Sequence, residues 1–272
     1  MENAKYNRQF RPWNAQMKNC IAISAFKDNY IWAIANEQNL FVVDPGDAQP
    51  VVEYLESHNL QLSGILLTHH HHDHSGGIDS LQAMAGNIPV YGSHKSTVKG
   101  INHPVKEGDV ISVFSHEFNI MEIPGHTLDH IAFFGEKALF CGDTLFSAGC
   151  GRIFEGTAPM MFHSVSRLAE LPSNTRVFCG HEYTLANLAF AKQVEPNNTE
   201  ITVTISKTKE RLETQGCSLP STLGDEQKIN PFFRCGETTV REAVENFSQK
   251  KLNSPEEVFA QLREWKNVFR AS

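Results

Sequence analysis

The sequence predicts an α/β domain followed by a smaller domain made only of helices. Up to His181, short runs rich in β-branched and aromatic residues end in Asn, Asp, Pro or Gly and alternate with helical stretches. Beyond His181 the strand pattern stops and the sequence looks helical. We therefore expect an N-terminal extension over residues 1–19, disordered as a tail, an α/β domain over 20–181 and a helical domain over 182–272.

Bulk composition indicates a soluble globular protein. The hydrophobic content is 40% and the charged content is 20%, both close to globular averages. No apolar run is long enough to cross a membrane, and a net charge of -7 disfavours nucleic acid as a partner. The polar N-terminus does not resemble a signal peptide, and the six cysteines lack CxxC spacing. We expect a cytoplasmic protein that is a monomer.

Local patterns place the elements of the first domain. Short β-rich runs bounded by turn residues predict strands at 20–26, 30–36, 40–47, 64–68, 88–92, 117–125, 130–135, 137–143 and 175–180. Apolar residues interleaved with polar ones predict helices at Gln49–His58 and Pro159–Leu171. The domain is therefore mixed α/β.

The C-terminal domain carries one strongly marked helix, which begins at the sequence SPEE. Ser254 can cap it, Pro255 suits its first turn, and Glu257 completes a capping box. Its apolar face is formed by Val258, Leu262, Trp265 and Phe269. Breaks in the helical pattern fall near 195–198 and around a loop at 216–233.

Four consecutive histidines follow the predicted strand 64–68, in the sequence GILLTHHHHDHSGG. In an extended chain end, alternate side chains point to the same side. His69 and His71 can therefore face one way while His70 and His72 face the other. We assign His70 and His72 to supporting or surface positions.

The turn after these histidines adds Asp73 and His74 to the same space. A mixed His/Asp set without cysteine is typical of catalytic sites for zinc, iron or manganese that keep open positions. Adjacent Asp73 and His74 cannot readily share one coordination sphere with His69 and His71. The sequence therefore predicts two metal ions, with further ligands at other strand ends.

Three more candidates each follow an apolar strand through a glycine: His126 in IPGHT, Asp143 in FCGDT and His181 in FCGHE. Glycine leaves room for the backbone to approach a crowded metal centre. Singly, such residues are more often turn or cap residues. Together with THHHHDH they predict one metal centre.

The order of these motifs resembles the metallo-β-lactamase superfamily. The resemblance implies a four-layer αβ/βα sandwich with metals at strand ends. It also implies a first metal held by His69, His71 and His126, a second held by Asp73, His74 and His181, and Asp143 between them. Asp143 stands where many true β-lactamases have cysteine.

Further motifs resemble the hydroxyacylglutathione hydrolases, also called glyoxalase II: KDNYIW at 27–32, GDTLFSAGCGRIFEG at 142–156 and GHEYT at 180–184. In that family the helical domain binds substrate, and the residues here that match the glutathione contacts are Arg152, Tyr183, Arg263 and Lys266. Phe154 stands where some members carry tyrosine. Independently, a net-acidic protein that binds the two carboxylates of glutathione needs such local cations.

The resemblance implies hydrolysis of S-D-lactoylglutathione to D-lactate and glutathione, the second step of methylglyoxal detoxification. A hydroxide bridging two divalent ions, Zn²⁺ with Fe or Mn as alternatives, would attack the thioester. Asp73 and Asp143 are the candidate catalytic residues, and Asp73 would orient the hydroxide proton. No catalytic thiol is expected.

Three alternatives stay open on the sequence alone. A glutathione persulfide dioxygenase would use a single iron held by two His and one Asp, but this chain adds His181 and a helical extension. A nuclease would need a basic groove. A metal-stabilised binding module would have a closed site of mostly Cys and His ligands.

Overall fold

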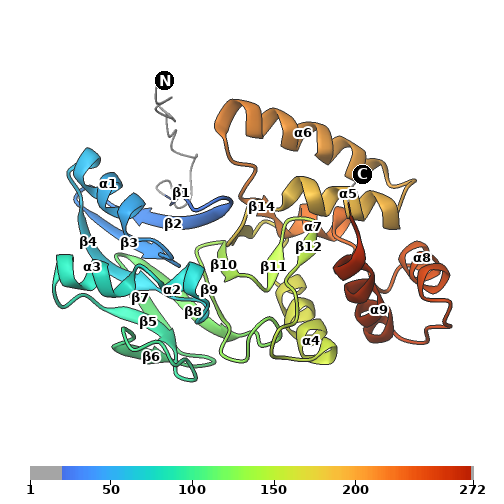
Figure 1. Cartoon of the computed structure of the whole chain (residues 1–272), viewed down its shortest axis with the longest axis horizontal. Coiled ribbons are helices and arrows are strands. Elements are labelled where there is room, and N and C mark those ends of the chain that lie inside the picture. The colour runs from blue at the N-terminus through green and yellow to red at the C-terminus, as the bar shows by residue number, and fades with distance from the viewer. Residues whose placement is uncertain (1–19, 271–272) are drawn as a thin grey trace.

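Two six-stranded sheets make up most of the first two-thirds of the chain. The computed structural model describes residues 20–270 (Figure 1), so the predicted extension over 1–19 lies outside the described residues. The first sheet has, in order, β1 (Cys20–Ala25), β2 (Asn29–Ala35), β3 (Asn39–Val43), β4 (Gln61–Leu66), β5 (Val90–Ser93) and β6 (His103–Val105). The second has β14 (Ser221–Thr222), β13 (Arg176–Cys179), β10 (Ala138–Gly142), β9 (Ile131–Gly135), β8 (His116–Glu122) and β7 (Val110–Val113).

The connections explain the direction of the strands. Tight turns join β1, β2 and β3, which pair antiparallel. From β3 to β6 the strands are parallel, because α1 (Gln49–His58) and α3 (Ile78–Ala85) cross between them. A short hairpin of β11 (Leu145–Phe146) and β12 (Gly149–Cys150) lies outside both sheets.

A single apolar core joins the two sheets. Trp32 and Val43 from the first sheet pack in the same buried cluster as Phe118, Phe133 and Phe140 from the second. A separate cluster holds α1 and α3 against the first sheet. Burying so much apolar surface is the main force that keeps the sheets face to face.

Helices dominate the rest of the chain. They are α4 (Ala158–Ala169), α5 (Thr184–Val194), α6 (Thr199–Gln215), α7 (Leu223–Ile229), α8 (Thr238–Ser248) and α9 (Pro255–Val268). A third buried cluster unites α4, α5, α8 and α9. Figure 1 shows α8 and α9 at the end of the molecule away from α1.

Most predicted elements agree with the structure. The helix over Gln49–His58 has the predicted bounds, and Ser254 caps α9 by accepting a hydrogen bond from the Glu257 amide. The Glu257 carboxylate reaches back to the Asn253 amide rather than to Ser254. The predicted loop 216–233 is wrong in part, since it contains β14 and α7.

Several short elements escaped the sequence-based prediction, namely β6, β7, β11, β12, α3 and the one-turn helix α2 (His72–Ser75). The division of the chain at residues 181 and 182 stays a prediction. β14 lies beyond that point but pairs with β13 in the second sheet.

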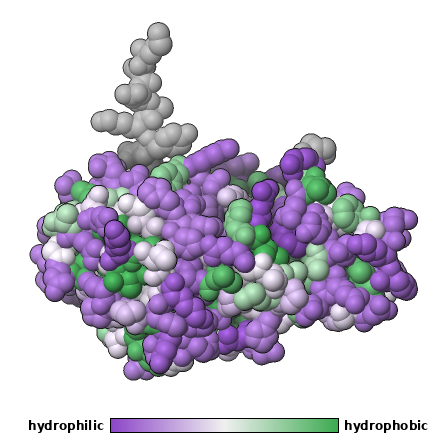
Figure 2. Space-filling model, turned by 60° about the horizontal axis from the view of Figure 1, so that its bottom comes forward, coloured by the Kyte–Doolittle hydropathy of each residue, from purple (hydrophilic) through white to green (hydrophobic). Residues whose placement is uncertain are grey.

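Within residues 20–270, no helix is both long enough and apolar enough to span a membrane. The face of the molecule in Figure 2 is mostly hydrophilic, with small hydrophobic patches between charged side chains.

Candidate metal centre

The candidate ligands meet at the ends of strands. His69 and His71 follow β4, Asp143 follows β10, and His181 follows β13. The one-turn helix α2 carries Asp73 and His74. A backbone bridge between Asn29 and His181 joins the two sheets at this edge. The side chains predicted from scattered motifs therefore come from both sheets to one place.

The first three-residue group consists of His69, His71 and His126, whose ligand atoms lie within 4.8 Å of one another. The Nδ1 atom of His71 is 3.1 Å from Nε2 of His69 and 3.0 Å from Nε2 of His126. Three ring nitrogens thus converge on one point.

Hydrogen bonds fix which nitrogen each ring presents there. Nδ1 of His126 lies 2.8 Å from the Arg152 carbonyl oxygen, which can only accept, so Nδ1 carries the proton. Nδ1 of His69 lies 3.0 Å from the Thr68 hydroxyl, which itself donates to Asp44. Both rings therefore offer an unprotonated Nε2 to the group, as a metal ligand must.

The second group consists of Asp73, His74 and His181, again within 4.8 Å of one another. Oδ2 of Asp73 is 3.6 Å from Nε2 of His74 and 3.4 Å from Nε2 of His181. The other ring nitrogen of each histidine faces a carboxylate, Asp44 for His74 at 3.1 Å and Asp28 for His181 at 2.9 Å. Each Nε2 is thereby directed into the group.

Asp143 lies between the two groups and is buried. Its Oδ2 is 3.6 Å from Nε2 of His126 in the first group and 3.2 Å from Nε2 of His181 in the second. Its Oδ1 is 3.4 Å from Nε2 of His74. This is the position that the resemblance implied for a residue shared by two ions.

The two groups differ in their electrostatics. Burial lowers the pKa of His69, His71 and His126, which favours neutral imidazoles. Burial also opposes charge on His181, but its hydrogen bonds to Asp143 and Asp73 raise the pKa of His181 to about 10. In the second group, the negative charge of Asp143 and Asp73 thus favours a proton on His181. A bound cation would balance that negative charge in its place.

The residues present fit a pair of cations. Nε2 of His74 and Oδ1 of Asp143 are buried and have no hydrogen-bond partner, which is costly unless a ligand satisfies them. In the first group, three ring nitrogens face one another and two are unprotonated, so an ion at their centre would relieve the repulsion. Imidazole and carboxylate donors suit Zn²⁺, Fe or Mn.

Sequence reasoning missed the residues that orient these ligands. Asp44 accepts hydrogen bonds from the Thr68 amide and hydroxyl and faces His74, while Asp28 faces His181. Asn29 donates to Asp73 at 3.1 Å. The signals were present, since Asp44 stands in VDPGD at a strand end and Asp28 in KDNY, but only the fold shows their partners.

A cluster of His70, Asp129 and Glu155 lies nearby. His70 is 2.9 Å from Asp129 through Nδ1 and 3.3 Å from Glu155 through Nε2. It thus links the histidine run to the segments after His126 and Arg152. The assignment of His70 to a supporting or surface position stays a prediction.

Glycines make the crowding possible. A Cβ on Gly180 would lie 2.5 Å from Oδ1 of Asp143 and 2.6 Å from Cε1 of His74. Gly142 has a φ of +46° and faces the Thr68 hydroxyl so closely that a Cβ would collide with it. Both glycines directly precede a candidate ligand, as expected for close backbone approach.

The four residues matched to glutathione contacts differ in exposure and in what they touch. Arg152 is exposed, and the Tyr183 ring stacks on the His181 ring with centroids 4.7 Å apart. Lys266 is partly buried over the rings of Phe190 and Phe269. Arg263 is buried and donates to the Cys150 and Gly151 carbonyls.

Charge links three of these residues. Burial lowers the pKa of Lys266 to about 8, and the positive charges of Arg263 and Arg152 add to the shift. Within residues 20–270, none of the three forms an ion pair with a carboxylate. They form a cationic cluster, in which Arg152 contacts the candidate ligand His126 through its carbonyl oxygen, and their role as direct substrate contacts stays a prediction.

Exposed aromatic rings border the site. Phe154 is 63% exposed, and its ring lies edge-on to His71 and His126, at 5.6 and 5.2 Å between centroids.

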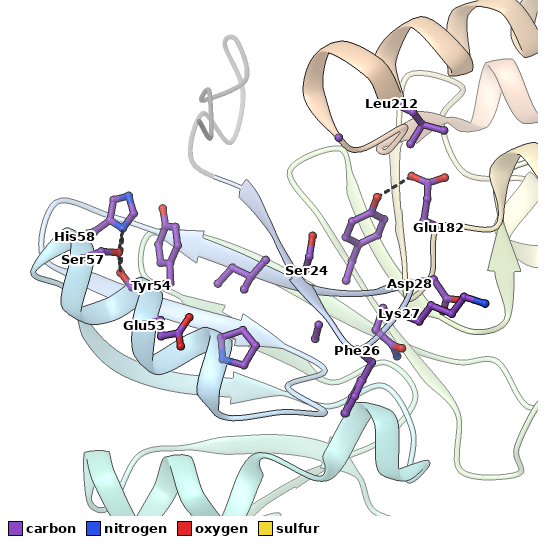
Figure 3. Close-up of a pocket in the computed structure, with 16 residues that line it drawn as sticks. Ser24, Phe26, Lys27, Asp28, Glu53, Tyr54, Ser57, His58, Glu182 and Leu212 are labelled. Atoms are coloured by element: carbon purple, nitrogen blue, oxygen red, sulfur yellow. Dashed lines mark hydrogen bonds between the residues drawn. The ribbon is translucent and has the colours of Figure 1, made fainter. Parts of the chain in front are cut away.

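A cavity of about 860 Å³ runs between α1, the β1–β2 turn and Glu182. Figure 3 shows Lys27 and Asp28 at its end; none of its lining residues is a candidate ligand.

Comparison with protein families gives two matches that together cover most of the chain. Residues 26–181 match the metallo-beta-lactamase superfamily. Residues 182–269 match the hydroxyacylglutathione hydrolase C-terminus.

Solved structures share the fold. ETHE1 from Myxococcus xanthus aligns with a TM-score of 0.62 at 24% identity, over 97% of this chain and 93% of that one. The BLEG-1 B3 metallo-beta-lactamase aligns with a TM-score of 0.59 at 22% identity, over 79% of this chain and 98% of that one. These likenesses confirm the predicted α/β metallo-β-lactamase fold.

Closer relatives are similar over nearly their whole length. A hydroxyacylglutathione hydrolase of Nitrosomonas europaea is 46% identical over 94% of this chain and 98% of its own. A hydroxyacylglutathione hydrolase of Pseudoalteromonas translucida is 49% identical over 91% of this chain and 98% of its own length. With its His/Asp groups at the strand ends and its helical C-terminal region, this chain belongs to the hydroxyacylglutathione hydrolase family of the metallo-β-lactamase superfamily.

Proposed function

We propose that the chain hydrolyses the thioester of S-2-hydroxyacylglutathione, with S-D-lactoylglutathione as the representative substrate and D-lactate and glutathione as products. This reaction is the second step of methylglyoxal detoxification. The observation that carries the proposal is the pair of His/Asp groups with Asp143 between them. Relatives at 46–49% identity that are named for this activity support it, and they do not favour the persulfide dioxygenase alternative.

Seven side chains would hold two divalent cations. His69, His71 and His126 would bind the first, and Asp73, His74 and His181 the second. Asp143 would contact both. When bound, such a pair lowers the pKa of water so that a nucleophile is available at neutral pH, and it polarises the thioester carbonyl.

The protein residues supply position and proton acceptance. The hydrogen bond from His181 is the largest cause that lowers the pKa of Asp73 well below its usual range, with a contribution from Asn29. A cation held by the same group would take the place of that proton and likewise favour the ionised carboxylate. An ionised Oδ of Asp73 can accept and orient the proton of the attacking water. The leaving group is a thiolate, whose departure needs little acid assistance because thiols have a pKa near 8.5.

The cationic cluster would bind the carboxylates of glutathione. Arg152 offers an exposed two-pronged donor, and Lys266 and Arg263 add positive charge. Tyr183, 37% exposed and stacked on His181, would offer its hydroxyl to the substrate. Phe154, where some relatives carry tyrosine, offers the substrate an apolar edge instead of a phenol.

The finer points of the proposal rest on the sequence. Zn²⁺ is the proposed metal, and Fe or Mn suit the same donor set. A monomer in the cytoplasm without a nucleic-acid partner is proposed from the acidic net charge and the cysteine pattern.

The deciding experiment is the initial rate of loss of thioester absorbance with S-D-lactoylglutathione, before and after chelation and after metal is restored. We expect turnover that vanishes with the metal and returns with it. Asp73→Ala should lose on the order of 100-fold or more in kcat, since even partners of ligands are worth 10–100-fold. Asp79→Asn, an exposed change on α3, is the matched control.

Metal-replete protein that cleaves no thioester would refute the hydrolase proposal and bring oxygen-dependent persulfide oxidation forward. Near-normal kcat in metal-replete Asp73→Ala would refute the role of Asp73 alone.

A further inference from the structure

Arg263 is unusual among the cations near the site because it is 4% exposed. Its Nη1 donates to the Cys150 carbonyl at 2.7 Å and to the Gly151 carbonyl at 3.4 Å. Its guanidinium carbon lies 5.3 Å from the centre of the Phe232 ring. An arginine held in this way orders the backbone that it contacts.

The backbone that Arg263 contacts leads to a residue that is hydrogen-bonded to a candidate ligand. The residue after Gly151 is Arg152, whose carbonyl accepts the Nδ1 proton of His126 at 2.8 Å. That hydrogen bond sets the tautomer and the direction of the His126 ring. Arg263 on α9 is therefore connected to His126 of the first metal group through the backbone of residues 150–152.

The segment between them has little freedom to absorb a displacement. A Cβ on Gly151 would collide with the Asp143 carbonyl, and it would lie 3.2 Å from Nδ1 of His126. The Gly151 amide donates to the Thr144 carbonyl. A shift of this segment would thus be felt by two candidate ligands.

Other buried polar side chains of the helical region hold an earlier part of the same loop, before Cys150. Asn230 donates to the Phe146 and Gly149 carbonyls, and Glu226 accepts from the Ala148 amide at 2.7 Å. Arg263 holds the end of the loop that is closest to His126. It is also the only cation among these three.

We propose that Arg263 is a positioning residue that orients His126 through the Cys150–Arg152 backbone, so that the helical region tunes the first metal group. The inference rests on the metal site of the proposed function. It differs from the role as a glutathione contact, because it requires an effect on metal binding when substrate is absent.

The test compares Arg263→Met, which keeps much of the side-chain length but removes the donors, with Lys266→Met as the control. Lys266 belongs to the same cationic cluster and the same helix, but its hydrogen bond goes to the Ala186 carbonyl rather than to the Cys150–Arg152 backbone. Zinc affinity is measured by competition with a chromophoric chelator. The Nδ1–H resonance of His126 is followed in zinc-loaded, ¹⁵N-histidine-labelled protein.

We expect Arg263→Met to weaken the binding of one zinc about tenfold, in the range seen for partners of ligands, and to broaden the His126 resonance by faster exchange. Lys266→Met should leave both unchanged and raise only KM. Unchanged zinc affinity and a sharp His126 signal in Arg263→Met would overturn the proposal.

Arg263→Lys is the second variant, in case the methionine variant does not fold. It keeps the charge but not the forked donor, so the proposal predicts weaker zinc binding with KM nearly retained. The reverse result, a raised KM with full zinc affinity, overturns it.

Zinc affinity is measured without substrate. Wild-type protein that binds two zinc ions but cleaves no thioester therefore refutes the proposed function and leaves the proposal about Arg263 testable. A wild type that binds no zinc overturns both.

Discussion

His74 and His181 each turn one ring nitrogen toward a carboxylate and the other toward the metal groups. The ligand residue types could be predicted from sequence because they stand in one short motif and at strand ends. Their partners Asp44 and Asp28 lie 30 and 153 residues away along the chain. No local pattern reports such distances, so the supporting contacts had to come from the fold.

Under the proposed function, in which Lys266 binds a carboxylate of glutathione, substrate binding is sensitive to pH. Burial and the charges of Arg263 and Arg152 lower the pKa of Lys266 to about 8, so it is cationic below that pH and neutral above it. We expect KM for S-D-lactoylglutathione to rise by up to about tenfold between pH 7 and 9, since one unit above the pKa leaves about a tenth of the lysine protonated.

Lys266→Arg keeps the charge at every pH and should flatten the KM profile, with Lys207→Arg on α6 as the exposed control. If Lys266→Arg and the wild type gave the same rise in KM, another group would have to be responsible.

At the scale of secondary structure, long elements with regular patterns were predictable. The Gln49–His58 helix and the Ser254 cap follow local rules that the structure confirms. The missed strands are short, although the missed helices α3 and α7 have eight and seven residues. β6 has three residues and β14 two, too few to show alternation, and they exist because a neighbouring strand offers hydrogen-bonding partners.

An ion pair ties α5 to α8 and to the turn before it. The Glu195 carboxylate, buried at the end of α5, accepts hydrogen bonds from Arg234 and from Thr239. Burial alone would raise the pKa of Glu195, but these hydrogen bonds outweigh it and hold the pKa below the ordinary value of 4.5. The stability they contribute is full above about pH 4.5 and is lost as pH falls through the lower folded pKa.

Glu195→Gln should lower the free energy of unfolding by about 2 kcal/mol at pH 7, because it weakens the pairing of a buried carboxyl position with a partly buried arginine. The difference from wild type should shrink below pH 4.5. Urea unfolding at several pH values measures it, with Glu210→Gln, exposed on α6, as control. A difference that does not change with pH would show that packing, rather than charge, accounts for the loss.

Across the whole molecule, the cysteines form no disulfides. All six are free, and five are buried. Burial raises the pKa of every one of them: Cys20, Cys141, Cys150, Cys179, Cys217 and Cys235. Because the thiolate is the reactive form, none is suited to act as a nucleophile, which agrees with the expectation of no catalytic thiol.

In Ellman's assay, native protein should therefore show fewer than one reactive thiol per chain within minutes, and denatured protein should show six. Rapid labelling of a native cysteine would contradict the burial, and peptide mapping would identify it. Fewer than six reactive thiols in the denatured protein would instead indicate disulfides.

The pairing of β14 with β13 has a consequence for how the protein is made. β13 ends at Cys179, but the strand that covers its free edge arrives only at Ser221 and Thr222. During synthesis, the nascent chain must extend by about forty residues past β13 before this edge is covered. Until then one edge of β13, a strand of mostly apolar residues, stays open, the kind of edge on which neighbouring chains aggregate.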